Sequence, residues 1–572
     1  MKFRWSLAPS QPALAQHLAD AVKISPLLAQ CLLNRGFSEP EKIAHFLEPR
    51  LKMLADPFLL PNMSAAVDRL FLARAQNELV VIFGDYDVDG VTSATLLIQT
   101  LRALGWKVEA YLPHRLDEGY GLSQEGVENC LAKFPVQLLL AVDCGSTAFA
   151  TISWLKDRQI DVVVLDHHQV STPLPPAVAL VNPQLESNPA QSFRELCSAG
   201  LAFKLAHALV KRGRDQGWTE AHDLDLRPSL DLVALGTIAD LVPLTGENRI
   251  LTKIGLEYLN RSRRPGIVAL RNVSQTTNTI GCYEVGFQLA PRLNAAGRLE
   301  NAEEALRLLL CTDAAQAEPI AQMLNSRNRE RQEIERGIST EVIGAVRARF
   351  NAETDYVIVE GQLLWHIGVV GIVASRVLHE FYRPTIIVGG DSQSWRGSGR
   401  SVEGFDLAAA LRECDDLLVK HGGHAMAAGL TIDPKNLDAF RTRLNELARR
   451  TLKREQLQPV LRLDAEVELP QLSAERILEL EKLNPIGQKN PQVTLCARRL
   501  THQRPPQRMG KQSQHAKFWV GNGGKMFEAV WWNCGDAAFP KDSFDLAFVP
   551  QINEFNGKSS MQLKVLDWKA CD

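Results

Sequence analysis

Acidic residues and histidines follow three short aliphatic segments of the chain. The segments cover residues 79–83, 136–142 and 161–165, and the residues behind them are Asp85, Asp87, Asp89, Asp143, Asp166, His167 and His168. A further carboxylate, Asp240, follows the apolar stretch 230–239. So many like charges, brought together, would repel one another and take up protons unless cations neutralised them. Carboxylates with one or two imidazoles suit Mn²⁺ or Mg²⁺, so these residue types predict a divalent-metal site.

The elements that must position these residues can be read from the same region. Helical stretches separate the aliphatic segments between about residues 78 and 250. Continuous apolar runs are typical of strands buried in a parallel sheet, which a βαβ arrangement builds. In open α/β sheets, ligands bind at the carboxyl ends of the strands. The acidic residues stand at that end of each predicted strand, so we expect one sheet edge to gather them.

The chemistry expected of such a site is phosphodiester hydrolysis. Two divalent ions about 3.5–4 Å apart can clamp the attacking and leaving oxygens of a phosphoryl displacement and activate a water molecule. Two alternatives compete with a metal site, because a lone Asp after a strand is often a helix N-cap and Asp85–Gly90 resembles a calcium loop. The calcium loop lacks its glutamate, since residue 96 is Leu96. Helix caps do not need an Asp-His-His triplet, so the combination favours a metal-dependent phosphodiesterase.

The remaining chain divides by its patterns. Its first part has a helical pattern that prolines interrupt, and a highly charged helical stretch follows residue 310. A second α/β pattern comes next, and the chain closes with short strands and turns. We therefore expect an α/β protein with two α/β lobes joined by a long helix, plus a C-terminal β-barrel of the OB type. We expect an N-terminal helical segment over residues 1–70 and a catalytic domain over 71–310. A connecting helix over 311–352 would lead to a second α/β domain over 353–455, and the barrel would cover 456–572.

Several groups outside the acidic cluster are suited to holding a phosphodiester. His114 and Arg115 follow the expected strand 108–112, at the same sheet edge as the carboxylates. Others lie in three stretches that contain several glycines or alanines. The first stretch holds Arg292, Asn294 and Arg298, and the last holds Gly422, Gly423 and His424. The middle stretch, with Arg396, Ser398, Arg400 and Ser401, is interpreted as a tight glycine-rich turn. Arginine binds phosphate through two parallel hydrogen bonds. A single arginine is more often a solvated surface residue, and the glycine context favours the binding role.

Residues 482–527 contain no acidic residue but nine lysines and arginines, and aromatic residues lie in or just beyond them. The aromatic residues are Phe518, Trp519, Phe527, Trp531 and Trp532. A basic groove with stacking faces is what an unpaired nucleic-acid strand requires. We expect most of these rings to fill the barrel core and one or two to stack on bases. Arg327, Arg329, Arg331 and Arg336 form either a second phosphate-tracking surface or, with the glutamates between them, a self-paired solvated face.

Composition limits the remaining possibilities. The ten cysteines include no Cys-x-x-Cys pair, so a zinc ribbon is not supported. The N-terminus lacks a continuous apolar segment and no apolar run reaches about 20 residues, so we expect a cytoplasmic protein without a membrane anchor. The segment 421–429 lacks the Gly-Lys-Ser/Thr ending of a P-loop, so ATP dependence is not expected.

Seven motifs, in order along the chain, carry a family resemblance. They are GDYDVDGVTS (84–93), VDCGS (142–146), DHH (166–168), GTIADLVPL (236–244), PRLNAAGRL (291–299), RGSGRS (396–401) and GGHAMAAG (422–429). With them, the chain resembles the DHH phosphoesterase superfamily and, within it, the RecJ family of single-strand-specific exonucleases. The resemblance covers nearly the whole length, and the last two motifs resemble the DHH-associated domain.

This resemblance implies roles for individual residues. The metal ligands would be Asp85, Asp87, Asp89, Asp143, His167 and Asp240, with Asp143 as the bridge between two ions of Mn²⁺ or Mg²⁺. His168 would position a phosphate, and Asp166 would orient a histidine. The substrate would be held by Arg115, Arg292, Asn294, Arg298, Ser398, Arg400 and Gly423. Within that set, Arg115, Ser398 and Arg400 would grip the 5′-phosphate, and His424 would contact a phosphate or stabilise transition-state charge.

The resemblance also implies an activity and partners. It implies a 5′→3′ exonuclease on single-stranded DNA that releases nucleoside 5′-monophosphates in recombination and repair. A single-strand-binding protein and a helicase would be its partners, and it would act as a monomer. The first alternative is a hydrolase of small substrates, which the basic C-terminal stretch disfavours. The second is a metal-free scaffold in a replication complex, which the complete set of motif carboxylates disfavours.

Overall fold

The structure is a computed structural model. It describes residues 3–114, 117–119, 121–185, 193–277, 279–299, 301–390, 395–522, 525–555 and 558–571. The chain forms two compact units. The first, called here the parallel-sheet unit, comprises Glu48–Arg331 and Asn484–Pro491. The second, called here the barrel unit, comprises Met1–Leu47, Gln332–Leu483 and Gln492–Asp572. The five expected domain ranges stay a prediction.

Five parallel strands form the sheet of the parallel-sheet unit, in the order β3-β2-β4-β5-β6. They are β2 (Leu79–Gly84), β3 (Lys107–Tyr111), β4 (Leu138–Val142), β5 (Asp161–Leu165) and β6 (Ala179–Val181). Val80 and Ile82 point into one hydrophobic core and Val81 and Phe83 into another, so helices cover both faces of the sheet. Burial of both faces explains why these strands read as unbroken apolar runs. The predicted βαβ architecture is confirmed.

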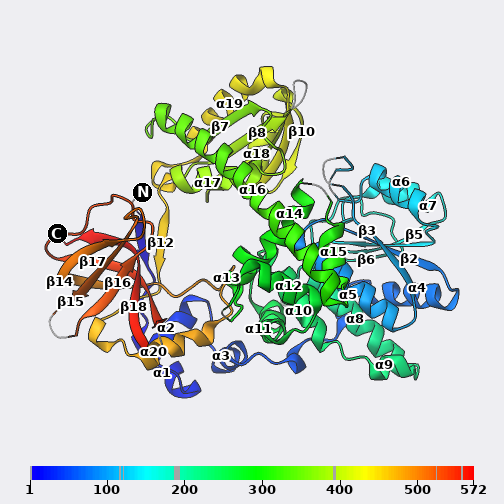
Figure 1. The fold of residues 1–572 in the computed structure, drawn as a ribbon, viewed down its shortest axis with the longest axis horizontal. Coiled ribbons are helices and arrows are strands. Elements are labelled where there is room, and N and C mark those ends of the chain that lie inside the picture. Colours follow the sequence, from blue (N-terminus) through cyan, green and yellow to red (C-terminus); the bar gives the residue numbers. More distant parts are fainter. Residues whose placement is uncertain are drawn as a thin grey trace. The chain divides into compact units, whose positions relative to one another are not determined.

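Helices surround this sheet (Figure 1). The core on the Val80 side includes residues of α4 (Met63–Ala75), α5 (Val88–Ala103) and α8 (Ser198–Asp215), and the core on the Val81 side includes residues of α6 (Gln124–Lys133) and α7 (Phe149–Lys156). The helix α10 (Leu230–Ala239) is apolar and buried on all sides. The later helices are α9 (Thr219–Asp223), α11 (Gly246–Arg261), α12 (Pro265–Ser274), α13 (Cys282–Glu284), α14 (Ala290–Leu299) and α15 (Glu303–Leu310). None of the described helices is long and apolar enough to cross a membrane.

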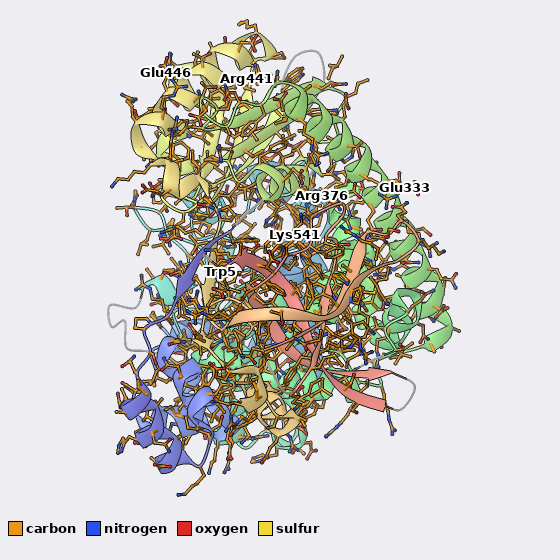
Figure 2. All side chains as sticks on the ribbon, turned by 90° about the vertical axis from the view of Figure 1, so that its left-hand side faces the viewer. Trp5, Glu333, Arg376, Arg441, Glu446 and Lys541 are labelled. Atoms are coloured by element: carbon orange, nitrogen blue, oxygen red, sulfur yellow. The ribbon has the colours of Figure 1, made fainter. Side chains whose placement is uncertain are left out.

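A mixed five-stranded sheet lies in the barrel unit, in the order β10-β11-β9-β8-β7. Its strands are β7 (Ile358–Leu363), β8 (Thr385–Gly390), β9 (Trp395–Arg400), β10 (Leu418–Gly423) and β11 (Ala427–Ile432). One face packs against α17 (Val370–Phe381) and the end of the long helix α16 (Ala314–Arg349); the other packs against α18 (Leu407–Arg412) and α19 (Leu437–Thr451). Arg376 of α17, labelled in Figure 2, pairs with the buried Glu335 of α16.

The expected tight turn over 396–401 is wrong, because Trp395–Arg400 is a strand paired on both sides, with β8 and with β11. Its glycines serve close packing instead of chain reversal. A Cβ atom on Gly397 would lie 2.3 Å from Cγ1 of Val388, and one on Gly399 would lie 2.5 Å from Cδ2 of Leu407. Glycine in a strand often marks such a close approach.

Five strands close the C-terminal barrel through the pairing of β14 with β17. They are β14 (Leu495–Met509), β15 (His515–Gly521), β16 (Phe527–Trp531), β17 (Phe544–Phe555) and β18 (Lys558–Ala570), and the short β13 (Ala465–Glu466) pairs with β14. Residues of α1 (Pro12–Val22), α2 (Pro26–Asn34), α3 (Pro40–Leu47) and α20 (Ala474–Leu480) share the barrel core. The expected fold class is confirmed.

The N-terminal segment differs from its helical prediction at one point. The strand β1 (Arg4–Leu7) pairs in parallel with β12 (Val460–Leu463). The strand was not predicted because its pairing partner is distant in the sequence and leaves no local pattern. Four residues are also too few to show the alternation of side chains that is typical of a strand.

Candidate metal centre

The parallel sheet brings the acidic residues together at its carboxyl edge. Asp85, Asp143 and Asp166 directly follow β2, β4 and β5. Their backbone N–H groups continue the strand ladder: Asp85 donates to the carbonyl of Val142 at 3.2 Å, Asp143 to that of Leu165 at 3.0 Å, and Asp166 to that of Val181 at 3.1 Å. These bonds fix the three residues at one edge, as the sequence predicted.

Helix α5 begins among the same residues. Oδ1 of Asp87 caps the helix and accepts hydrogen bonds from the N–H groups of Asp89 (2.9 Å) and Gly90 (3.1 Å). The N-cap role considered from the sequence therefore holds for Asp87, beside any ligand role. A Cβ atom on Gly90 would lie 2.4 Å from the carbonyl oxygen of Asp85, so this tight entry into the helix requires glycine.

His167 lies among three carboxylates from different elements. Its Nε2 atom is 3.5 Å from Oδ1 of Asp143, 3.5 Å from Oδ2 of Asp240 and 3.9 Å from Oδ2 of Asp89. Asp240 is the C-cap of α10, which carries it to this edge. Among the described residues, three groups of side chains could hold a metal ion, and within each group the ligand atoms lie within 4.8 Å of one another. The groups are Asp89 with His167 and Asp240; Asp85 with Asp87 and Asp143; and Asp143 with His167 and His168. Asp143 belongs to two of these groups, and its Oδ1 atom is also 3.5 Å from Nε2 of His167, which belongs to the remaining one.

The electrostatics of this cluster favour a bound cation. Burial first, and the neighbouring carboxylates second, raise the pKa of Asp89 to about 7 and that of Asp240 to about 9, and raise the pKa of Asp143 well above its usual range. Burial lowers the pKa of His167 to about 4, so its imidazole is neutral. Within the described part of the chain, His167 Nε2 and Asp240 Oδ2 are buried without a hydrogen-bond partner. A neutral imidazole among crowded carboxylates fits a divalent metal.

His168 is held differently from His167. Its Nδ1 atom lies 2.7 Å from Oδ1 of Asp166, whose other oxygen accepts a hydrogen bond from the N–H group of Ser146. Burial alone would lower the pKa of His168, but the bond and charge of Asp166 outweigh it and raise the pKa to about 9. At neutral pH this imidazole is therefore a cation. The predicted orienting contact of Asp166 is present.

Two glycines of the later motifs pack directly on the acidic loop. A Cβ atom on Gly236 would lie 2.5 Å from Oγ1 of Thr92 and 2.8 Å from Oδ1 of Asp89. One on Gly297 would lie 2.6 Å from the carbonyl oxygen of Tyr86. In α14, Oδ1 of Asn294 accepts a hydrogen bond from the N–H group of Val88 at 3.1 Å. These motifs therefore shape the acidic loop. The sequence analysis singled out both motifs but assigned no role to Gly236 or Gly297.

Ser198 is a site residue that sequence reasoning missed. Its hydroxyl donates to Oδ1 of Asp143 at 2.8 Å. Its backbone N–H and that of Ala199, at the start of α8, donate to the two oxygens of Asp89 at 2.7 and 2.8 Å. The small residues Cys197–Gly200 were the available signal, since they permit this close approach of a helix start to carboxylates.

The substrate-binding residues predicted from the sequence fall in two places. Arg292, Asn294 and Arg298 belong to α14 of the parallel-sheet unit. Ser398, Arg400, Gly423 and His424 belong to the mixed sheet of the barrel unit and to the turn after β10. There, Nη1 of Arg400 donates to Oγ of Ser398 at 2.9 Å, and the N–H group of His424 donates to the carbonyl of Ala427. Arg115 lies outside the described residues.

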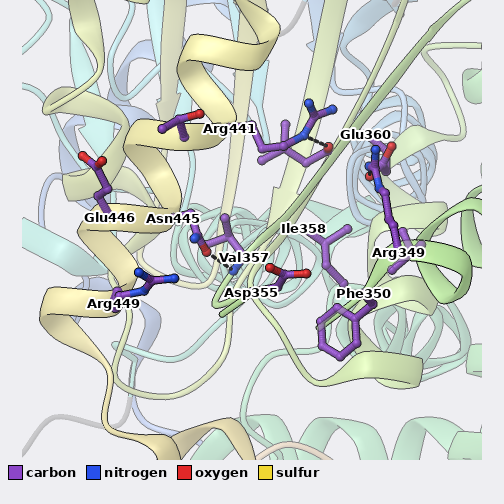
Figure 3. A pocket seen from close by; sticks show the side chains of 13 residues that line it. Arg349, Phe350, Asp355, Val357, Ile358, Glu360, Arg441, Asn445, Glu446 and Arg449 are labelled. Atoms are coloured by element: carbon purple, nitrogen blue, oxygen red, sulfur yellow. Dashed lines mark hydrogen bonds and ion pairs between the residues drawn. The ribbon is translucent and has the colours of Figure 1, made fainter. Parts of the chain in front are cut away.

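The barrel unit also contains a hollow. It measures about 490 Å³, and Figure 3 shows Arg349, Arg441 and Arg449 on its wall beside Glu360 and Glu446. Arg349 pairs with Glu360, and Nε of Arg441 donates to the carbonyl of Val359 at 2.9 Å. No predicted site residue lines it.

Several basic side chains of the C-terminal stretch form ion pairs that the sequence did not predict. Arg498 pairs with Glu466 (3.1 Å) and Asp545 (2.6 Å), and Lys517 pairs with Glu528 (2.6 Å), all acids from outside the stretch. Folding thus neutralises part of the charge that the sequence left unopposed. In the helix α16, Arg331 is buried and donates to Oδ1 of Asn328, so it does not belong to an open surface of arginines.

The aromatic rings of this stretch divide between the barrel core and its surface. Phe518 and Phe527 lie in the barrel core. Trp519 is half-buried, with the cations of Arg504 and Lys517 each 5.1 Å from its ring, and Trp532 is 46% exposed. Trp531 is partly buried against the core, so Trp519 and Trp532 are the candidates for stacking on bases, which stays a prediction.

Comparison with known families assigns a class to this architecture. The family model described as "DHH family, N-terminal domain" matches residues 79–237, the DHHA1 domain matches 354–450, and the RecJ OB domain matches 463–567. A parallel sheet with this acid–histidine edge, followed by a DHHA1 domain, defines a DHH-family phosphoesterase.

Individual relatives narrow the class. The single-stranded-DNA-specific exonuclease RecJ of Dickeya dadantii is 38% identical over 577 residues, covering 97% of each chain. The crystal structure of RecJ from Thermus thermophilus in complex with Mn²⁺ matches with a TM-score of 0.85 at 30% identity, over 100% of this chain and 80% of that chain. The structure of the same protein in complex with Mg²⁺ matches with a TM-score of 0.78 at 29% identity, over 100% of this chain and 79% of that chain. The chain belongs to the RecJ family of single-stranded-DNA-specific exonucleases. The resemblance and the exonuclease class expected from the sequence are confirmed.

Proposed function

We propose that this protein degrades single-stranded DNA from the 5′ end and releases nucleoside 5′-monophosphates, with two divalent ions, Mn²⁺ or Mg²⁺, at the carboxyl edge of the parallel sheet. The observation that carries the proposal is the convergence of Asp89, Asp143 and Asp240 on His167, with buried ligand atoms that lack hydrogen-bond partners among the described residues. The metals held by the Thermus thermophilus relative support the choice of ions.

The ligand sets suggest how the ions would be shared. Asp89, His167 and Asp240 would hold one ion, Asp85 and Asp87 would hold the other, and Asp143 would bridge them. When bound, the ions supply polarisation of the phosphate and activation of a water molecule. His168, kept cationic by Asp166, would place a positive charge at a phosphate oxygen where charge develops in the transition state.

Polarity would depend on recognition of the strand end. Arg400 and Ser398 lie side by side on β9, and a guanidinium next to a hydroxyl can grip a terminal phosphate through several hydrogen bonds. We assign them, with Arg115, to the 5′-phosphate. His424 is assigned to a phosphate contact, and Arg292, Asn294, Arg298 and Gly423 are assigned to the strand behind it.

The experiment is digestion of single strands labelled at either end, with Mn²⁺ present. Labelled mononucleotide should appear first from the 5′ label, and circular single strands should resist degradation. Cleavage of circles, or mononucleotide released first from the 3′ label, would overturn the assigned polarity. Asp143→Asn keeps the residue's shape and should abolish hydrolysis; metal analysis of both proteins should find fewer ions bound to the variant.

The cellular setting is part of the same proposal. We place the enzyme in recombination and repair in the cytoplasm, acting as a monomer with a single-strand-binding protein and a helicase. Light scattering of the purified protein, and co-purification with each partner, test these points separately from the nuclease assay.

A further inference from the structure

Two aromatic rings stand in solvent on the helix that leads into α14. Tyr283 is 62% exposed and Phe287 is 70% exposed. They are four residues apart, and their rings stack with centroids 4.9 Å apart and planes 29° from parallel. Exposed rings of this size, already stacked on each other, are a ready surface for a flat ligand.

The backbone under these rings is firmly held. Residues Val285–Leu289 form a π-helical turn between α13 and α14, and such turns often occur at functional sites. Val285 and Leu289 are buried in the core on the inner side. Oε2 of Glu284 accepts a hydrogen bond from the N–H group of Gly281 at 2.8 Å, and Thr276 donates to the side chain of Gln288 at 2.6 Å. The rings are thus presented outward from a fixed support.

Positive charge follows the rings along the same helix. Nε of Arg292 donates to the neutral side-chain oxygen of Asn325 at 3.0 Å, and Nη1 donates to the carbonyl of Gln288. Burial first, and the nearby cation of Arg329 second, lower the pKa of Arg292. Two neighbouring guanidinium groups favour a polyanion, because phosphates would relieve their repulsion.

We propose that Tyr283 and Phe287 form a stacking platform for a base of the single-stranded DNA substrate, a few nucleotides away from the metal centre; this inference rests on the proposed function. Phe287 lies seven residues before Asn294, which contacts the acidic loop at Val88. That separation is roughly 10 Å along a helix, the length of about three stacked nucleotides at ~3.4 Å each. Every base has a π-face, so this contact suits an enzyme that accepts any sequence.

The first test is binding of oligo-dT, measured by fluorescence anisotropy in the Asp143→Asn background, which prevents degradation. The double change Tyr283→Ala and Phe287→Ala should weaken binding about tenfold, the size expected for one lost base–aromatic stack. The control is Val268→Ala on α12, which removes part of an apolar side chain that is 42% exposed. It should leave the affinity unchanged, as should the conservative Phe287→Tyr.

The second test separates base stacking from other causes. A series of oligonucleotides carries one abasic residue at successive positions from the 5′ end. When the abasic residue lies at the position that contacts the platform, it should lower the affinity of the protein with wild-type rings about tenfold. The same oligonucleotide should bind the double variant with nearly unchanged affinity. Equal losses in both proteins at every position would overturn the platform, because the rings would then act by packing against protein.

The two proposals fail in different ways. Unchanged affinity of the double variant, in a protein that still degrades single strands, would overturn the platform and leave the proposed function intact. Absence of single-strand degradation by the wild type would overturn the function and the platform with it.

Discussion

The hydroxyl of Ser198 donates a 2.8 Å hydrogen bond to Oδ1 of Asp143, a carboxylate that belongs to two of the three groups of potential metal ligands found among the described residues. Asp143 itself has a left-handed backbone, with φ of 63°. This conformation is costly for residues other than glycine and persists where the surroundings enforce it. The start of α8 and the end of β4 together therefore fix the direction of this carboxylate.

Ser198→Ala should lower both Mn²⁺ affinity and turnover by about 10- to 100-fold, the usual effect of removing a group that orients a metal ligand. The fold should survive, because the backbone bonds from Ser198 and Ala199 to Asp89 remain. Titration of activity with Mn²⁺ measures the change. The matched control is Thr95→Val, which removes a buried hydroxyl that donates to the carbonyl of Val91 within α5. An unaltered Mn²⁺ dependence in Ser198→Ala would refute the orienting role.

The stability of the metal-free protein should fall as pH rises. The pKa values of Asp89 and Asp240 are raised to about 7 and 9 in the folded state, above the ordinary value of 3.8. Between pH 4 and 9 the folded state therefore binds more protons than the unfolded state, and stability decreases with pH across that window. Thermal unfolding in chelator from pH 5 to 9 should show this decline, and added Mn²⁺ should remove it. A flat profile in chelator would contradict the raised pKa values.

Gly236→Ala should impair the enzyme although the residue carries no charge. The added methyl would meet Thr92, Ala199 and Asp89 at 2.5 to 2.8 Å, and overpacking of this kind costs about 1–3 kcal/mol. Moving Asp89 should also raise the Mn²⁺ concentration needed for activity. Gly337→Ala in α16 is the control, since its Cβ would meet nothing within 4 Å and should raise stability by roughly 0.5–1 kcal/mol. Urea unfolding of both variants tests the contrast; equal stabilities would contradict it.

Much of the metal centre could be predicted because its signals are local. Asp85, Asp143 and Asp166 each follow an unbroken apolar run, and parallel strands necessarily end at one edge. His167 and His168 come from the same strand end as Asp166. Asp240 follows a helix instead, but most residues of that helix are apolar, so the end of the apolar stretch could still be located in the sequence.

The residues that escaped prediction depend on contacts distant in the sequence. Ser198 meets a carboxylate 55 positions away, and its own surroundings show only the start of a helix. Gly397 and Gly399 looked like turn residues, because their closeness to Val388 and Leu407 appears only in the folded sheet. The charge of Arg498 looked unopposed because Glu466 and Asp545 lie on other strands.

Arg400→Ala should remove the preference for a 5′-phosphorylated end. In the proposed role, the guanidinium beside Ser398 would offer charge-assisted hydrogen bonds to a terminal phosphate, which a terminal hydroxyl cannot accept with equal strength. We expect kcat/KM on a 5′-phosphorylated single strand to exceed that on a 5′-hydroxyl strand, and the variant to lower only the former, by about 10- to 100-fold for a lost charged hydrogen bond of ~1.5–3 kcal/mol. Arg412→Ala, an exposed arginine at the end of α18 in the same unit, is the control and should preserve the preference. If Arg400→Ala slowed both substrates equally, Arg400 would act on the strand or the fold and not on its end.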